Sequence, residues 1–199
     1  MSRIRQILKE EILKESYSGV EGYLKAVAEM TGEKQRIYYT WILKNMKKVP
    51  VVHHQDSKVL THHIKELLRK TPSSMICQKK GCYETAFRTA LNRDIHIEYV
   101  EGYVQSIIPI VHAWNYYPEE NIYFDLTNDV AWKGEDSRFD EYYEVKRFSN
   151  YELSQWSSIT GYAGGFMESP QFMREIIDTQ GDMYNRDEWD IFNEPDENK

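Results

Sequence analysis

The 199-residue chain has little of several residue types, and each shortage excludes a class of protein. Its two cysteines are too few for a disulfide scaffold, so we interpret both as thiols. No stretch approaches 18 consecutive apolar residues, and we therefore expect no membrane-spanning helix. Acidic side chains near the start interrupt the apolar core that a signal peptide needs, which favours a cytoplasmic location. No phosphate-binding loop, Gly-x-Ser-x-Gly motif or dinucleotide fingerprint is present, and we expect no cofactor.

Aromatic residues are plentiful by contrast, with 15 Tyr, 7 Phe and 5 Trp. That much apolar surface excludes disorder as the main state, and the length suits one domain with its own core. Charge is uneven, because residues 1–80 carry a net charge of +8 and residues 81–199 a net charge of −15. A basic front and an acidic back argue against nucleic acid as a partner of the whole chain, although the front alone could contact an anionic surface. We interpret the asymmetry as complementary halves of one fold or dimer.

The spacing of apolar residues changes from helical to strand-like along the chain. Apolar positions at helical spacing predict helices over about 4–13, 18–30, 34–48, 57–71 and 82–91. Alternating and apolar runs predict strands over about 95–99, 107–117 and 121–127. Beyond Val130 the periodicity is weak, apart from a tight glycine loop over 161–165 and one helix around 173–178. Helices followed by antiparallel strands indicate the α+β class.

Two of the predicted strands can bring a histidine and a carboxylate together. If they form a hairpin with a four-residue loop over 117–120, His112 lies directly opposite Asp125. Opposed residues of neighbouring antiparallel strands have Cβ atoms about 4.5–5.5 Å apart. Trp114 and Tyr123 then share the face of this pair. A carboxylate held against an imidazole fixes one tautomer of the base, which is the arrangement of a catalytic pair.

Cys82 can supply the nucleophile that such a pair serves. It follows Gly81 at the start of a predicted helix, where unpaired N–H groups and the helix dipole favour a thiolate. The Cys82 N–H and the Gln78 side chain are candidate donors to an oxyanion. Trp114 and Tyr103 are candidate substrate-binding residues, although packing is the commoner use of such aromatics. The pairs His53-His54 and His62-His63 lack a further Cys or acid, so we expect no metal site.

The stretch from Gly81 to Thr127 resembles the transglutaminase-like superfamily, a papain-related group of cysteine enzymes. The shared pattern is a Cys that opens a helix (GCYETAFRTAL), a strand with Gly-Tyr (YVEGYV), then His-Ala-Trp, then Asp-x-Thr. The resemblance implies a Cys82–His112–Asp125 triad, with Cys82 as nucleophile, His112 as general base and acid, and Asp125 as its orienting group. It also implies a papain-like core in which the Cys-bearing helix packs on an antiparallel sheet.

The resemblance implies hydrolysis or transfer of an amide bond, with a protein or peptide as substrate. On this interpretation residues 1–199 form one transglutaminase-like domain. It comprises a helical part over 1–75, a catalytic core over 76–170, and a C-terminal helix with an acidic tail over 171–199. An alternative is an inactive member of the same fold that serves as a protein-binding module, since fold does not fix function.

Overall fold

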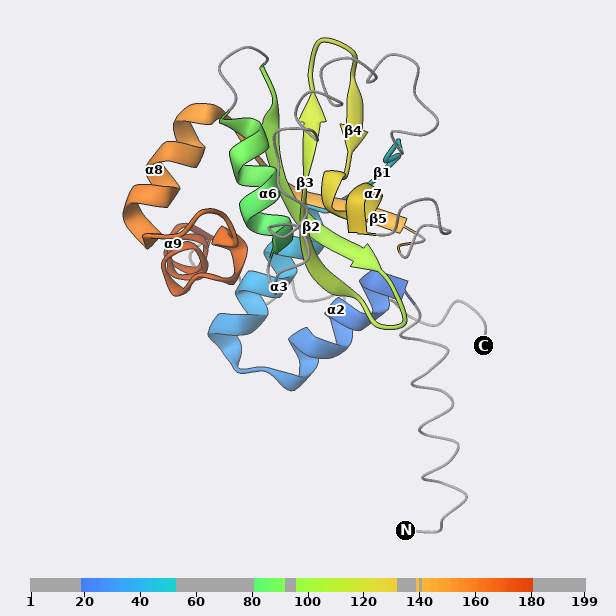
Figure 1. The fold of residues 1–199 in the computed structure, drawn as a ribbon. Helices are drawn as coiled ribbons and strands as arrows, with labels where there is room; N and C mark the ends of the chain where they lie inside the picture. The colour runs from blue at the N-terminus through green and yellow to red at the C-terminus, as the bar shows by residue number, and fades with distance from the viewer. Residues whose placement is uncertain (1–18, 53–80, 92–95, 132–138, 140, 181–199) are drawn as a thin grey trace. The chain divides into compact units, whose positions relative to one another are not determined.

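The computed structural model describes residues 19–52, 81–91, 96–131, 139 and 141–180 (Figure 1). The chain divides into two compact units, one of residues 1–44 with 172–199 and one of residues 45–171. The elements are α2 (Gly19–Met30), α3 (Glu33–Asn45), β1 (Lys47–Val49), α6 (Gly81–Ala90), β2 (Glu98–Gln105), β3 (Ile110–Tyr117), β4 (Ile122–Phe124), α7 (Leu126–Ala131), β5 (Glu141–Phe148), α8 (Asn150–Thr160), a 3-10 turn (Phe166–Glu168) and α9 (Pro170–Gln180). The helices predicted over 4–13 and 57–71 and the acidic tail lie outside the described residues.

The first unit contains α2, α3 and most of α9. α2 buries Val20, Leu24 and Ala28, which are four residues apart and therefore share one face. The predicted helices over 18–30 and 173–178 are confirmed as α2 and α9. The helix predicted over 34–48 is wrong at its end, because it stops at Asn45 and the chain continues as β1. β1 is extended because it pairs with the edge of β5.

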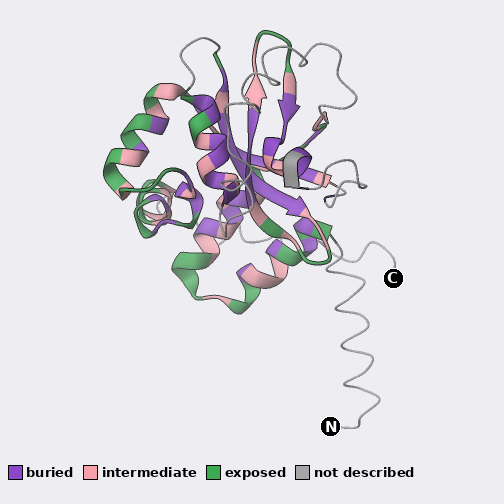
Figure 2. Ribbon diagram, viewed as in Figure 1, coloured by how far each residue is buried: buried purple, intermediate pink, exposed green. Residues whose placement is uncertain are grey.

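The second unit is built on a five-stranded antiparallel sheet in the order β1-β5-β2-β3-β4. β2 lies at its centre, and its residues from Tyr99 to Val104 are buried (Figure 2). The strands predicted over 107–117 and 121–127 contain β3 and β4, whereas the strand predicted over 95–99 overlaps β2 only at its first two residues. It did not predict β5 or α8. The described residues thus form an α+β fold, and none of their helices is both long and apolar enough to cross a bilayer.

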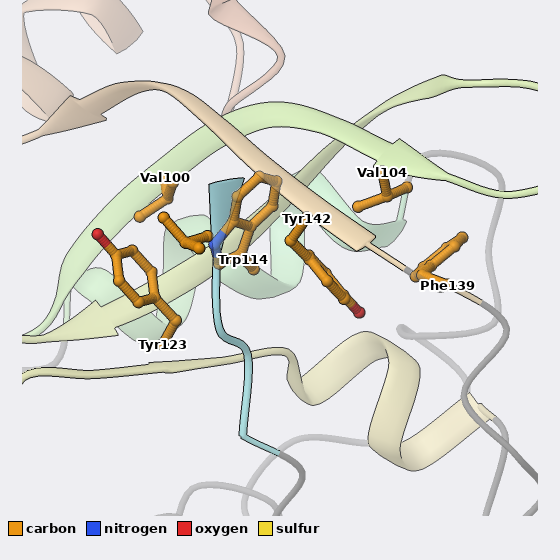
Figure 3. Packing of buried hydrophobic residues seen from close by; sticks show 7 residues of the cluster. Val100, Val104, Trp114, Tyr123, Phe139 and Tyr142 are labelled. Carbon is orange, nitrogen blue, oxygen red and sulfur yellow. The ribbon is translucent and has the colours of Figure 1, made fainter. Parts of the chain in front are cut away.

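The two faces of the sheet are covered differently. One face carries a cluster of buried apolar residues from the five strands and from Phe139, which precedes β5 (Figure 3): Val49, Val100, Val104, Trp114, Tyr123, Phe139 and Tyr142. On the other face, α6 packs against β2 and β3. The buried Asn115 of β3 fixes this helix, because its side-chain N–H donates to the Ala86 carbonyl over 2.9 Å. The sheet and α6 therefore share one hydrogen-bonded contact within the core.

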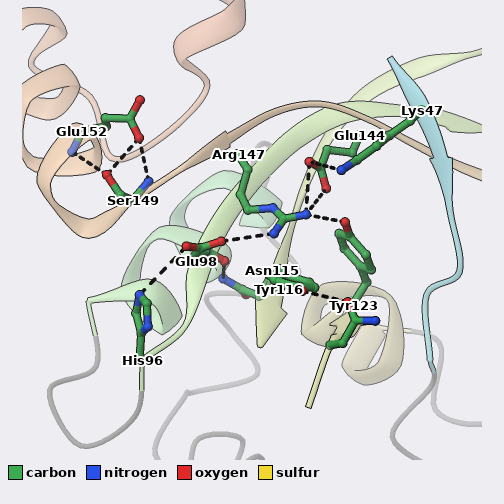
Figure 4. Close-up of polar contacts among 11 residues, drawn as sticks. Lys47, His96, Glu98, Asn115, Tyr116, Tyr123, Glu144, Arg147, Ser149 and Glu152 are labelled. Carbon is green, nitrogen blue, oxygen red and sulfur yellow. Dashed lines mark hydrogen bonds and ion pairs between the residues drawn. The ribbon is translucent and has the colours of Figure 1, made fainter. Parts of the chain in front are cut away.

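Arg147 of β5 joins several strands through its guanidinium (Figure 4). It donates to Tyr123 over 2.5 Å and to Glu144 over 3.1 Å, and it pairs with Glu98 of β2 at 3.4 Å. The guanidinium also lies 3.7 Å from the ring centre of Tyr116. These contacts connect β5 to β2, β3 and β4, and so help to fix the strands that position the candidate site.

Candidate active site

Cys82 is the second residue of α6, as the sequence predicts. It is a free, partly exposed thiol on a helix whose other residues are mostly buried against the sheet. The N–H of Cys82 is one of the first four in α6, and such groups have no partner within their own helix. A negative charge that forms beside Cys82 can therefore accept a hydrogen bond from this N–H, and the positive end of the helix dipole stabilises it.

His112 on β3 lies against Asp125, with 2.7 Å between His112 Nε2 and Asp125 Oδ2. The predicted contact is confirmed, but the predicted hairpin register is wrong by two residues. Tyr116 pairs with Tyr123 rather than with Asn121, because the loop is 118–121 and not 117–120. The two-residue slip preserves the alternation of faces, so Trp114 and Tyr123 still share one side.

Asp125 reaches His112 from a helix start rather than from a paired strand. β4 ends at Phe124, and the Asp125 carbonyl accepts the N–H of Asp129 over 3.1 Å. Oδ1 of Asp125 accepts the N–H of Asn128, also over 3.1 Å, which is the bonding pattern of an N-cap. The helix start thus holds one carboxylate oxygen and leaves the other, Oδ2, directed at His112.

Tyr142 of β5 is a third member of this group that the sequence did not reveal. Its hydroxyl donates to Asp125 Oδ2 over 2.9 Å. Burial, and then the charge of Asp125, raise the pKa of Tyr142 well above its usual value, so the hydroxyl remains a donor. Asp125 consequently accepts hydrogen bonds from an imidazole, a phenol and a backbone N–H while it is 1% exposed.

These contacts favour the charged forms of His112 and Asp125. Burial alone would lower the pKa of His112, but the Asp125 carboxylate and a hydrogen-bonding contact with Cys82 raise it to about 10. Burial would likewise raise the pKa of Asp125, yet His112 and the two other donors hold it below its usual value. Because Nε2 is bound to Asp125, Nδ1 is the ring nitrogen left for a contact with Cys82. The structure therefore brings the three predicted residues Cys82, His112 and Asp125 together.

Aromatic rings enclose the imidazole. The His112 ring lies 4.9 Å from that of Phe139 and stacks at 6.2 Å on that of Trp114, measured between ring centres. Trp114 is 1% exposed and Tyr103 is 6% exposed, and Trp114 packs beside His112. A substrate-binding role for these two residues stays a prediction. The other predicted oxyanion donor, Gln78, lies outside the described residues.

Gly102 faces His112 across the β2–β3 pair, where a bulge interrupts the pairing of β2 with β5. A Cβ at this position would lie 2.0 Å from the Tyr143 carbonyl oxygen and 2.9 Å from the Trp114 ring. We expect Gly102→Ala to destabilise the protein by about 1–3 kcal/mol, because backbone and a buried indole must move apart. Urea unfolding measures this loss. Gly32→Ala is the control, since its nearest contact is a flexible side chain at 3.4 Å.

No group of three or more His, Cys, Asp or Glu residues in the described part of the chain is arranged to hold a metal ion. The two His-His pairs of the sequence fall outside that part. No protein-family model, curated protein or solved structure matches the chain. The chemistry of the site therefore has to be inferred from its own geometry.

Proposed function

We propose that the protein is a cysteine-dependent amide hydrolase or acyltransferase that acts on a protein or peptide through a thioester at Cys82. The observation that carries this proposal is the position of His112, whose Nε2 binds a buried carboxylate while the ring contacts Cys82. A nucleophile, a base and a group that orients the base are the three parts of such a mechanism.

The contacts support a reaction in two halves. The Cys82 thiolate attacks the carbonyl carbon, and the new oxyanion is bound by the N–H of Cys82 at the start of α6. The His112 Nδ1–H gives its proton to the nitrogen as the C–N bond breaks, which releases the amine and leaves the thioester. Water or an amine then attacks the thioester, and His112 takes the proton of the attacking group. The C–S bond breaks and the thiolate–imidazolium pair is restored.

The order of the chain supports the transglutaminase-like interpretation. A Cys-bearing helix is followed by a Gly-Tyr strand, a His-Ala-Trp strand and an Asp, and the helix packs on an antiparallel sheet. We propose this core for residues 76–170, of which residues 81–91, 96–131, 139 and 141–170 are described. Water as the acceptor gives a hydrolase and an amine gives a transferase.

Mapping of the reactive thiol tests the proposal. We expect iodoacetamide or a peptide-based electrophile to modify Cys82 in preference to Cys77, because Cys82 has the imidazole and the helix terminus beside it. Peptide mass mapping of the full chain identifies the adduct, and the Cys82→Ala variant serves as the control. Modification of Cys77 with Cys82 left unlabelled would overturn the proposal.

A further inference from the structure

Two hydrogen-bond donors meet at one oxygen of the candidate site. Asp125 Oδ2 lies 2.7 Å from His112 Nε2 and accepts the Tyr142 hydroxyl over 2.9 Å. The other oxygen, Oδ1, accepts the Asn128 N–H over 3.1 Å. The proposed mechanism gives His112 and Asp125 their parts and gives none to Tyr142. Any effect of this hydroxyl on the reaction is therefore transmitted through Asp125, the group that it contacts.

The Tyr142 ring holds the hydroxyl at a fixed point. Tyr142 is 4% exposed and lies on β5 between two paired strands, opposite Val49 of β1 and Val104 of β2. Its ring packs edge to face on Trp114 at 5.3 Å and on Phe139 at 5.8 Å between ring centres (Figure 3). A buried ring on a strand that is paired on both sides has little freedom to move. Replacement of the phenol by a phenyl ring removes the oxygen and leaves this packing in place.

The two anchored oxygens fix the plane of the Asp125 carboxylate. Asn128 holds Oδ1 from the start of α7, and Tyr142 holds Oδ2 from β5. A carboxylate held at Oδ1 alone can rotate about its Cβ–Cγ bond, and it would then turn Oδ2 away from His112. Outer partners of this kind orient the group that acts on the reacting atoms. His112 therefore meets a carboxylate in one orientation.

Tyr142 also limits the pull of Asp125 on the Nε2 proton, because two donors share the lone pairs of one oxygen. Burial raises the pKa of Asp125, whereas His112, the Asn128 N–H and the Tyr142 hydroxyl lower it, and the result lies below the usual value. A carboxylate with fewer donors is a stronger base and draws the Nε2 proton more strongly. The proton accordingly stays on the imidazole, which carries the positive charge in the proposed mechanism.

We infer that Tyr142 is a positioning residue of the candidate site: its hydroxyl holds Asp125 in one orientation against His112 and keeps the shared proton on the imidazole. The inference rests on the proposed function, because the orientation of His112 takes its importance from the contact with Cys82. Tyr142 acts through Asp125 and is therefore not a catalytic residue. A tyrosine that only filled the core would leave the site the same with or without its hydroxyl.

Proton NMR of the full-length protein tests this contact at pH 6, well below the His112 pKa of about 10. The Nε2–H resonance of His112 is assigned by its loss in His112→Gln. In Tyr142→Phe we expect this resonance to move downfield, because Asp125 then accepts the Nε2–H more strongly. A 3-fluorotyrosine incorporated at position 142 keeps the ring and the hydroxyl, and its more acidic phenol should move the resonance upfield.

Tyr99→Phe is the matched control. The buried Tyr99 hydroxyl donates to another buried carboxylate, that of Glu101 on β2, over 2.6 Å. Loss of this similar bond away from His112 should leave the Nε2–H resonance at its wild-type position. An unchanged resonance in both Tyr142 variants, or shifts of the same sign in both, would overturn the inference. The fluorinated variant alone decides the question if Tyr142→Phe does not fold.

Alkylation of Cys82 by iodoacetamide, measured on Cys77→Ser protein, reports the consequence for the thiol. We expect Tyr142→Phe to slow it about threefold, because a less firmly held His112 is turned away from Cys82 for part of the time. Tyr99→Phe should keep the wild-type rate. A wild-type rate in Tyr142→Phe would overturn the positioning role and leave the proposed function standing. Equal rates in the wild type and His112→Ala would overturn the proposed function itself, whatever the position of the NMR resonance.

Discussion

Replacing His112 by Ala is expected to slow alkylation of Cys82 about tenfold, because the thiol loses the imidazole that contacts it and can take its proton. The rate is compared at pH 6, 7 and 8, and His112→Ala should be the slower protein at each pH. The rate of iodoacetamide modification, with Cys77 replaced by Ser so that one thiol reports, gives both curves.

Asp125→Asn should give a curve between those of the wild type and His112→Ala. The asparagine is nearly isosteric and can still accept the Asn128 N–H, so the fold should be retained. The imidazole loses its counter-charge and the group that fixes its tautomer, and its charged form becomes less favoured. Three superimposable curves would show that His112 and Cys82 do not interact, and the proposed site would be abandoned.

Stability should fall as the pH rises from about 6.5 towards 10. The pKa of His112 is raised in the folded protein to about 10 from an ordinary value of 6.5. The ionised His112 therefore contributes its full stabilisation of the folded state below pH 6.5. Above that pH the stabilisation falls, because the unfolded chain loses its proton while the folded protein still holds it. The slope should approach, at most, about 1.4 kcal/mol per pH unit. The pKa of Asp125 is lowered, so its contribution is present above pH 3.8 and is lost in acid.

Urea unfolding at pH 6, 7, 8 and 9 measures this slope. The double variant His112→Gln/Asp125→Asn should flatten it, because it replaces both charged groups by amides. The matched control is His96→Gln, which removes a histidine whose side chain is 55% exposed and should keep the slope of the wild type. An equal slope in the double variant would mean that the His112–Asp125 pair is not the source of the pH dependence.

The sequence predicted the Cys-bearing helix and the His112–Asp125 contact because both depend on local patterns. Alternation alone places His112 and Trp114 on one face of the sheet, and a shift of the hairpin register by two residues does not change that face. The register itself depends on where the turn falls, and Asn121 allows the observed loop by adopting a φ of +55°. The role of Asp125 as the cap of α7 could not be separated from a strand position by periodicity.

Tyr142 and the burial of Glu101 were not predictable in the same way. β5 carries a bulge that leaves Val145 outside the pairing with β2, so its apolar residues do not alternate cleanly. The sequence pattern therefore does not distinguish Tyr142 from the other tyrosines of this acidic stretch. Glu101 lies in an apolar strand, where a carboxylate would ordinarily face solvent. The hydroxyl of Tyr99 and the backbone N–H groups of residues 166 and 167 together explain its burial, and the two N–H groups come from a distant loop.

The position of β2 at the centre of the sheet also bears on the order in which the strands pair during folding. β2 and β3 are joined by a short turn and can pair early, whereas β5 enters between β1 and β2 from much later in the chain. Contacts between distant segments carry a larger loop-closure entropy and form more slowly. His112 and Asp125 can therefore meet within the nascent hairpin before Tyr142 arrives. A collapsed chain in which β5 has not yet docked would lack the Tyr142 hydrogen bond to Asp125. We expect such a chain to be inactive in the proposed reaction.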